Sequence, residues 1–126
     1  MLRGVWMRVL IVESEPNLAL LWQRHLSRFC ETVCVEHDQD GAVSRLTQSG
    51  YDVILLDLVL ASGSAFAVAD FAAYRYPETK IIFVTSTTFF SDGSIFRLMP
   101  NACAFLPTET PPEDIAAVVE HYGTAV

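Results

Sequence analysis

The stretch Tyr51-Asp52-Val53-Ile54-Leu55-Leu56-Asp57 decides how this chain folds. Its central residues, 53–56, are apolar and branched, and the apolar run stops at a carboxylate. A short run of this kind is typical of a strand buried on both faces, as strands in parallel sheets are. In open parallel sheets, ligands and chemistry gather outside the carboxyl ends of the strands. The pattern therefore predicts that Asp57 stands where such a fold places its chemistry.

Four other short apolar runs alternate with segments of helical spacing. Strands are predicted over 9–12, 32–35, 53–56, 81–84 and 104–106, and helices over 16–29, 38–49, 65–74, 91–99 and 112–122. This alternation indicates an α/β fold with a parallel sheet, right-handed crossovers and helices on both faces. For five strands the flavodoxin-like order 2-1-3-4-5 is expected, in a doubly wound three-layer α/β/α arrangement. That order would make Glu13 and Asp57 neighbours.

Length and composition bound the function. The 126 residues suit one domain, placed at 8–122 between a short leader (1–7) and a tail (123–126). The net charge of −7 argues against direct binding to nucleic acid, because phosphate-binding surfaces are basic. No apolar run approaches the roughly 20 residues that span a bilayer, and no signal-peptide pattern precedes the first strand. We therefore expect a cytoplasmic protein without membrane contact, either a single-domain protein or a piece of a longer one.

Other chemistry finds little support. The cysteines and histidines are Cys30, Cys34, Cys103, His25, His37 and His121. No CxxC pair occurs, so we expect reduced core thiols, and the histidines lack partners at metal-ligand spacing. The chain has no GxGxxG, Walker A or GxSxG motif, which argues against nucleotide cofactors and hydrolase chemistry.

The segment 65–74 is unusually apolar for a helix. Asp70 is almost its only polar residue. A surface helix needs a single apolar stripe, so the excess predicts either deep burial or a face for a partner. The sequence leaves these two alternatives open.

Three polar side chains are predicted at the carboxyl edge of the sheet. Glu13 and Asp57 end two strands, and clustered carboxylates normally need a cation, for which Mg²⁺ is the usual choice. An aspartate supported by metal is a known phosphoryl acceptor. The hydroxyl of Thr85 could then bond a phosphoryl oxygen. The competing interpretation is a set of unrelated loop acids.

Four segments together resemble the receiver domain of bacterial two-component response regulators, and the resemblance covers about 8–122. The segments are Val9-Leu10-Ile11-Val12-Glu13-Ser14-Glu15-Pro16, Tyr51-Asp52-Val53-Ile54-Leu55-Leu56-Asp57, Ile82-Phe83-Val84-Thr85-Ser86 and Ala102-Cys103-Ala104-Phe105-Leu106-Pro107. Each motif is weak alone, but four in order at the family's spacing are specific.

The resemblance implies roles for particular residues. Asp57 would accept a phosphoryl group from a histidine kinase or phosphotransferase. Mg²⁺ would be held by Glu13, Ser14 and Asp57 with the backbone carbonyl of Val59. The switch pair would be Thr85 and Phe105. The segments 91–99, 104–106 and 112–122 would form an output face for another protein or a second copy. Such a domain is a signalling domain and not an enzyme, with at most slow self-catalysed phosphoryl transfer and loss.

The chain also departs from the family pattern. Ser14 stands where an acid is expected, and a hydroxyl is a much weaker Mg²⁺ ligand than a carboxylate. Thr108 and Glu109 occupy the positions of the family's lysine and following proline. A charge-assisted hydrogen bond contributes roughly 1.5–3 kcal/mol, whereas turning a switch from 1:99 to 99:1 takes about 5.5 kcal/mol. Weak or absent Mg²⁺ binding is expected.

Three hypotheses follow. The first is a phosphorelay receiver with an atypical metal site. The second is a pseudo-receiver, an interaction module that acts independently of phosphorylation. The third is an unrelated flavodoxin-like ligand binder or enzyme.

Overall fold

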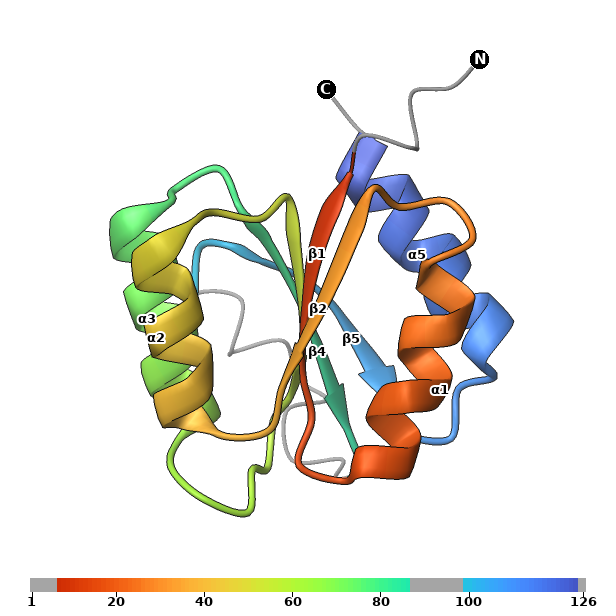
Figure 1. The fold of residues 1–126 in the computed structure, drawn as a ribbon, viewed down its shortest axis with the longest axis horizontal. Coiled ribbons are helices and arrows are strands. Elements are labelled where there is room, and N and C mark those ends of the chain that lie inside the picture. The colour runs from red at the N-terminus through yellow and green to blue at the C-terminus, as the bar shows by residue number, and fades with distance from the viewer. Residues whose placement is uncertain (1–6, 87–98, 125–126) are drawn as a thin grey trace.

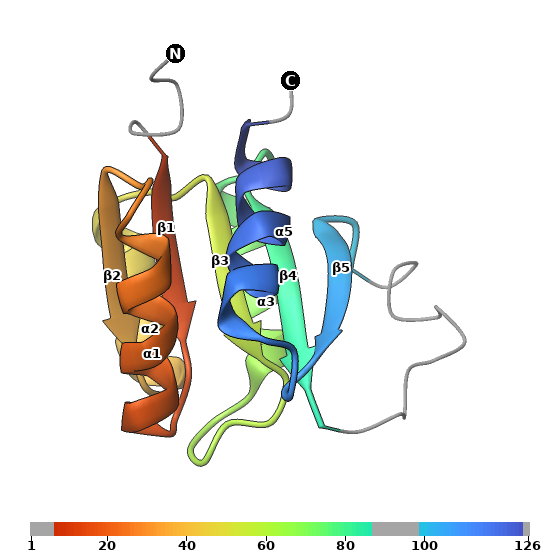
Figure 2. The ribbon, with the colours of Figure 1, turned by 90° about the vertical axis from the view of Figure 1, so that its right-hand side faces the viewer.

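The computed structural model describes residues 7–86 and 99–124, and these form one parallel sheet between two layers of helices (Figure 1). The strands are β1 (Arg8–Val12), β2 (Thr32–Glu36), β3 (Val53–Asp57), β4 (Lys80–Thr85) and β5 (Ala102–Pro107). The helices are α1 (Pro16–Leu26), α2 (Gln39–Gln48), α3 (Ala65–Arg75) and α5 (Pro112–Thr124). Figure 2 shows the strand order β2-β1-β3-β4-β5. The predicted fold class and strand order are confirmed.

Each face of the sheet carries its own hydrophobic core. Helices α2 and α3 cover one face and α1 and α5 cover the other (Figure 1). Leu10 and Ile54 point into the first core, and their neighbours Val9 and Val53 point into the second. Because successive strand residues face opposite sides, an uninterrupted apolar run is needed to fill both cores.

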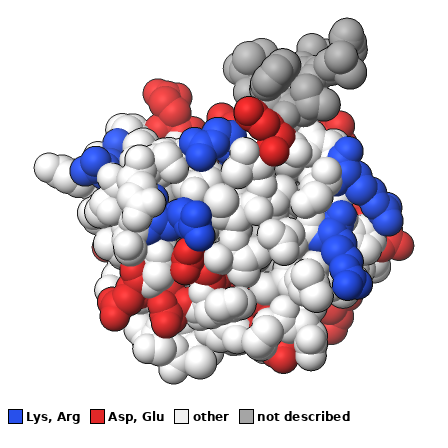
Figure 3. All heavy atoms as spheres, viewed as in Figure 1, with Lys and Arg blue, Asp and Glu red and all other residues white. Residues whose placement is uncertain are grey.

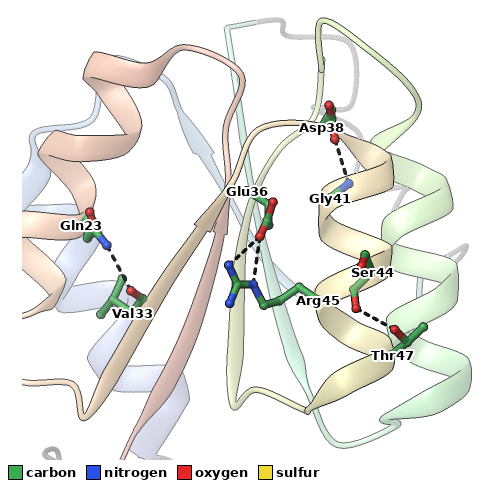
Figure 4. Close-up of polar contacts among 8 residues, drawn as sticks. All are labelled: Gln23, Val33, Glu36, Asp38, Gly41, Ser44, Arg45 and Thr47. Atoms are coloured by element: carbon green, nitrogen blue, oxygen red, sulfur yellow. Dashed lines mark hydrogen bonds and ion pairs between the residues drawn. The ribbon is translucent and has the colours of Figure 1, made fainter.

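Polar contacts fix where the helices begin and how they lie on β2 (Figure 4). Asp38 caps α2 by accepting a hydrogen bond of 2.8 Å from the backbone N–H of Gly41. Arg45 of α2 forms an ion pair of 2.7 Å with Glu36 at the end of β2. Side-chain oxygens of Glu15 and Ser64 cap α1 and α3 in the same way, satisfying helix N–H groups that lack a partner within the helix.

The apolar excess of α3 is mostly buried. Its inner face consists of the small residues Ala65, Val68, Ala69 and Ala72, and Phe66 and Phe71 pack against the same core. Small side chains let a helix lie close to the sheet. Tyr74, 86% exposed, is the one large apolar residue of this helix that is left largely in solvent.

Some boundaries differ from those expected. Helix α1 ends at Leu26, and residues 27–29 form a turn, although Phe29 continues the apolar spacing. Phe29 still packs against the second core. The apolar spacing therefore indicated correctly that this side chain contacts the core, but it did not show where the helical hydrogen bonds end. Strand β5 is longer than predicted. The three cysteines are free thiols, as expected, but are only partly buried. The helix predicted over 91–99 lies, apart from Met99, outside the described residues.

We expect the central strand to dominate stability. Leu55 of β3 is completely buried in the second core, so Leu55→Ala should lower the free energy of unfolding by about 2–5 kcal/mol. The matched control is Leu20→Ala on α1, where the side chain is 43% exposed and the change should stay within about 0.5 kcal/mol. Urea titrations of both variants measure the difference. Similar losses in the two variants would contradict this account of the core.

Candidate functional site

The site lies where β1, β3 and β4 end. Val12 is paired with Leu56, so the next residues, Glu13 and Asp57, lie side by side at the ends of β1 and β3. Asp57 is in turn paired with Val84, which places Thr85 one residue further along the neighbouring strand. Glu13 and Thr85 are buried and Asp57 is half-buried. The three polar side chains that the sequence predicted at this edge therefore come from adjacent strands.

Glu13 is a buried acid without enough partners. It is 3% exposed, and its Oε2 accepts a hydrogen bond of 2.9 Å from the backbone N–H of Glu15. Its Oε1 is buried and has no hydrogen-bond donor. Burial, together with the neighbouring carboxyl group of Asp57, raises the pKa of Glu13 to about 8. Two ionised carboxylates side by side repel each other, so the pair needs either a proton or a cation.

The backbone that follows Asp57 is held close to its carboxyl group. The N–H of Val59 donates a hydrogen bond of 3.0 Å to Asp57 Oδ1. The N–H of Leu58 donates to the carbonyl of Val84 at 2.9 Å. The side chain of Val59 is 67% exposed, so an apolar residue lies in solvent beside Asp57.

Ser14 is bound to two backbone groups. Its hydroxyl donates to the carbonyl of His37 at 2.8 Å and accepts from the N–H of Ala61 at 2.9 Å. These contacts join the loops that follow β1, β2 and β3. Ser14 therefore connects backbone groups of two other loops, which differs from its predicted role as a metal ligand.

Thr108 and Phe105 lie beyond β4. The N–H of Thr108 donates to the carbonyl of Thr85 at 3.0 Å, so the loop after β5 begins next to the site. The ring of Phe105 stacks on Phe83 with centroids 5.1 Å apart and planes inclined by 16°. Phe83 also meets Phe66 of α3, at 6.1 Å. An aromatic row thus runs from β5 across β4 to α3.

The donor set fits a magnesium ion held by few protein groups. Within residues 7–86 and 99–124, no three His, Cys, Asp or Glu side chains are grouped to hold a metal. Glu13 and Asp57 supply two carboxylates, and the unpartnered Oε1 of Glu13 is the kind of hard oxygen that Mg²⁺ binds. Mg²⁺ commonly uses one or two carboxylates and fills its other positions with water or phosphate oxygens. The residues present therefore fit such an ion.

Sequence similarity connects the chain with response regulators. It is 32% identical over 80 residues to the transcriptional regulatory protein DltR of Streptococcus agalactiae, which covers 64% of this chain and 36% of DltR. It is 27% identical over 119 residues to the response regulator protein PilR of Pseudomonas aeruginosa, which covers 94% of this chain and 26% of PilR. The chain thus spans about a third or less of these relatives. No model of a known protein family matches it.

Solved structures agree on the fold. The non-phosphorylated HemR receiver domain of Leptospira biflexa superposes with a TM-score of 0.84 at 18% identity, covering 96% of this chain and 97% of that one. The response regulator TrrA of Thermotoga maritima, solved in complex with Mg²⁺ and BeF, gives a TM-score of 0.79 at 19% identity, covering 93% and 99%. The chain is therefore similar in sequence to response regulators and has the fold of their receiver domains.

Receiver domains are signalling domains that interact with histidine kinases and output domains, and they generally bind Mg²⁺. In the described part of this chain, no helix is long and apolar enough to cross a membrane. On the face shown in Figure 3, the basic side chains are scattered and form no continuous patch.

Two residues at the site edge, His37 and Gln39, had no predicted role in the site. His37 Nδ1 lies 2.9 Å from the carbonyl of Glu13, and because a carbonyl only accepts, this nitrogen carries the proton. Gln39 bonds to the loop after β3 through its backbone and its side chain. Both residues follow β2, which ends at the same edge of the sheet. Their position after a predicted strand could therefore have placed them near the site. Burial raises the pKa of the thiols of Cys30 and Cys103 to about 12 and about 11, which disfavours their thiolate forms.

Proposed function

We propose that this receiver domain accepts a phosphoryl group on Asp57 from a histidine kinase or phosphotransferase and acts as a signalling domain rather than an enzyme. The observation that carries the proposal is the half-buried carboxyl of Asp57 beside the buried, under-partnered carboxyl of Glu13. In the transfer, an oxygen of Asp57 forms a bond to phosphorus. The donor's phosphorus–nitrogen bond breaks, and the released imidazole takes up a proton.

Glu13 and Asp57 would hold Mg²⁺, together with the backbone carbonyl of Val59. Bound Mg²⁺ supplies positive charge that offsets the negative charge of the transferring phosphoryl group. The complex of TrrA with Mg²⁺ and BeF shows that the fold can take this ion. Ser14 was predicted as a further ligand, but its hydroxyl is bound to two backbone groups. Because position 14 carries no carboxylate, we expect weak Mg²⁺ binding.

The response would leave the site through Thr85 and Phe105. Thr85 ends β4 beside Asp57, where its hydroxyl could bond a phosphoryl oxygen. Phe105 is paired with Phe83 on β4, so a shift of that strand end reaches β5 directly. An output protein or a second copy of the chain would bind around β5 and α5. We expect the protein to act in the cytoplasm. The predicted contribution of the segment 91–99 to that face lies, apart from Met99, outside the described residues.

The proposal is tested with a small-molecule phosphodonor. Incubation with acetyl phosphate, with and without Mg²⁺, followed by intact mass measurement, should show one added phosphoryl group that depends on the metal. An established receiver domain treated in parallel shows that the donor is active. If that domain gains the group and this one does not, self-catalysed phosphorylation of Asp57 is excluded.

A pseudo-receiver acting without phosphorylation is the second candidate. Two observations favour it: Thr108 replaces the family's lysine, and Phe105 stacks on Phe83. A ring held by this contact is less free to move as a switch. In this case a partner would bind wild type and Asp57→Asn equally well.

Restoring the lysine should strengthen the response to phosphorylation. Thr108→Lys places an ammonium group in the loop that meets Thr85, where a charge-assisted hydrogen bond is worth about 1.5–3 kcal/mol. We expect binding of beryllofluoride with Mg²⁺ to tighten roughly tenfold or more. Isothermal titration measures this affinity. Thr110→Lys, two residues further on, is the control for added charge, and equal gains in both variants would contradict a specific contact.

A further inference from the structure

We propose that Ser14 is a positioning residue whose hydroxyl ties the loop after β3 to the ends of β1 and β2, and so fixes the backbone beside Asp57. The proposal rests on the proposed phosphoacceptor function of Asp57. It differs from the predicted role of Ser14, because it assigns the hydroxyl to the protein's own backbone and not to the metal.

The hydroxyl of Ser14 acts as both a hydrogen-bond donor and an acceptor. It donates to the carbonyl of His37 at 2.8 Å and accepts from the N–H of Ala61 at 2.9 Å. His37 in turn donates through Nδ1 to the carbonyl of Glu13 at 2.9 Å. One hydroxyl therefore joins three loops that come from separate parts of the sequence.

Gln39 provides a second tie to the same loop. Its side-chain Oε1 accepts from the N–H of Ser64 at 2.8 Å, and its own N–H donates to the carbonyl of Ser62 at 3.3 Å. Gly63 lies between them with a φ of 86°, and a Cβ there would meet the side chain of Gln39. Glycine suits this position because the conformation and the close approach both exclude a side chain. The loop is thus held along its length, at Ala61 by Ser14 and at 62–64 by Gln39.

A carboxylate at position 14 could not make the same tie. It could accept from the N–H of Ala61, but it has no proton for the carbonyl of His37. Two acceptor oxygens at the 2.8 Å spacing of the present bond would repel each other. The family's acid and the serine found here therefore have different uses: an acid serves the metal, and serine closes the loop.

Fixing this loop matters because of what it carries. Val59, between Asp57 and Ala61, donates its N–H to Asp57 Oδ1. Its backbone carbonyl is a proposed Mg²⁺ ligand. A loop held at Ala61 presents both groups without first having to be ordered, and preorganisation of this kind lowers the barrier to a reaction. Ser14 would then compensate in part for the carboxylate that it replaces.

The test compares Ser14→Ala with Ser14→Thr, which keeps the hydroxyl. The first measurement is hydrogen exchange at the amide of Ala61 in protein free of Mg²⁺. We expect Ser14→Ala to speed this exchange about fivefold to tenfold, which matches the loss of one hydrogen bond, and Ser14→Thr to exchange at nearly the wild-type rate. Ser27→Ala, at an exposed serine at the end of α1, should leave Ala61 unchanged.

The second measurement is the maximal rate of phosphorylation by acetyl phosphate at saturating Mg²⁺. It should fall severalfold in Ser14→Ala and recover in Ser14→Thr. Unchanged exchange at Ala61 in Ser14→Ala would overturn the tie. Faster exchange with an unchanged phosphorylation rate would overturn the positioning role. If wild type itself is not phosphorylated, the proposed function fails, whereas the exchange measurement still decides whether the tie exists.

Discussion

In the absence of Mg²⁺, the free energy of unfolding is expected to fall by a few kcal/mol, in order of magnitude, as the pH rises from about 5 to about 8. The cause is Glu13, whose pKa rises from 4.5 to about 8 in the folded protein because it is buried beside Asp57. Between these values the folded chain keeps a proton that the unfolded chain releases. The stabilisation is therefore complete below about pH 4.5 and is lost as the pH passes about 8. Urea unfolding at a series of pH values measures the slope.

The matched variant for this prediction is Glu13→Gln. Glutamine is neutral at every pH, and its amide can donate to the carboxylate of Asp57 without a shared proton. Comparing the free energies of unfolding of the two proteins at each pH removes the contribution of groups that titrate alike in both. The variant should become more stable relative to wild type as the pH rises. Added Mg²⁺ at pH 8 should stabilise wild type more than the variant. Parallel pH profiles would show that Glu13 does not hold the proton.

Asp57→Asn is expected to abolish phosphorylation entirely, because the carboxamide cannot form the acyl phosphate. The same change should raise the stability of the Mg²⁺-free protein at pH 8 by about 1–2 kcal/mol, since it removes a neighbouring charge and supplies Glu13 with a donor. Intact mass after treatment with acetyl phosphate and urea unfolding test the two effects.

Asp70→Asn is the control for Asp57→Asn. Asp70 is exposed on α3, away from the carboxyl ends of the strands, and its replacement should leave both phosphorylation and stability near wild type. Full phosphorylation of Asp57→Asn would place the phosphoryl group on another residue. A loss shared by both variants would point to an indirect effect of charge.

The fold followed from simple patterns. Apolar runs such as 53–56 serve both faces of the sheet, and the strand order brings Glu13 next to Asp57 without any knowledge of side-chain positions. The predicted end of α1 is too late because Phe29, which lies in a turn, still packs against the second core. Strand β5 was judged too short because its pairing with β4 is irregular between Ile81 and Ile82, and spacing along one strand does not reveal such a shift.

The site was predictable only where backbone topology determines it. The sequence showed that Ser14 is not an acid and suggested a weakened metal site. It did not show that the hydroxyl would meet the carbonyl of His37 and the N–H of Ala61, because those groups come from two other loops. The stacking of Phe105 on Phe83 likewise depends on the register between β4 and β5. Such contacts depend on the positions of loops and side chains, which local spacing does not encode.

The central claim is that Asp57 is the phosphoacceptor, and mapping the modified residue tests it most directly. The protein is treated with acetyl phosphate and Mg²⁺, reduced with borohydride to trap an acyl phosphate as the corresponding alcohol, digested, and sequenced by mass spectrometry. The account predicts reduction at Asp57 in wild type, dependent on both donor and Mg²⁺. A protein that carries no trapped aspartate, or one trapped at any other acid, would contradict it.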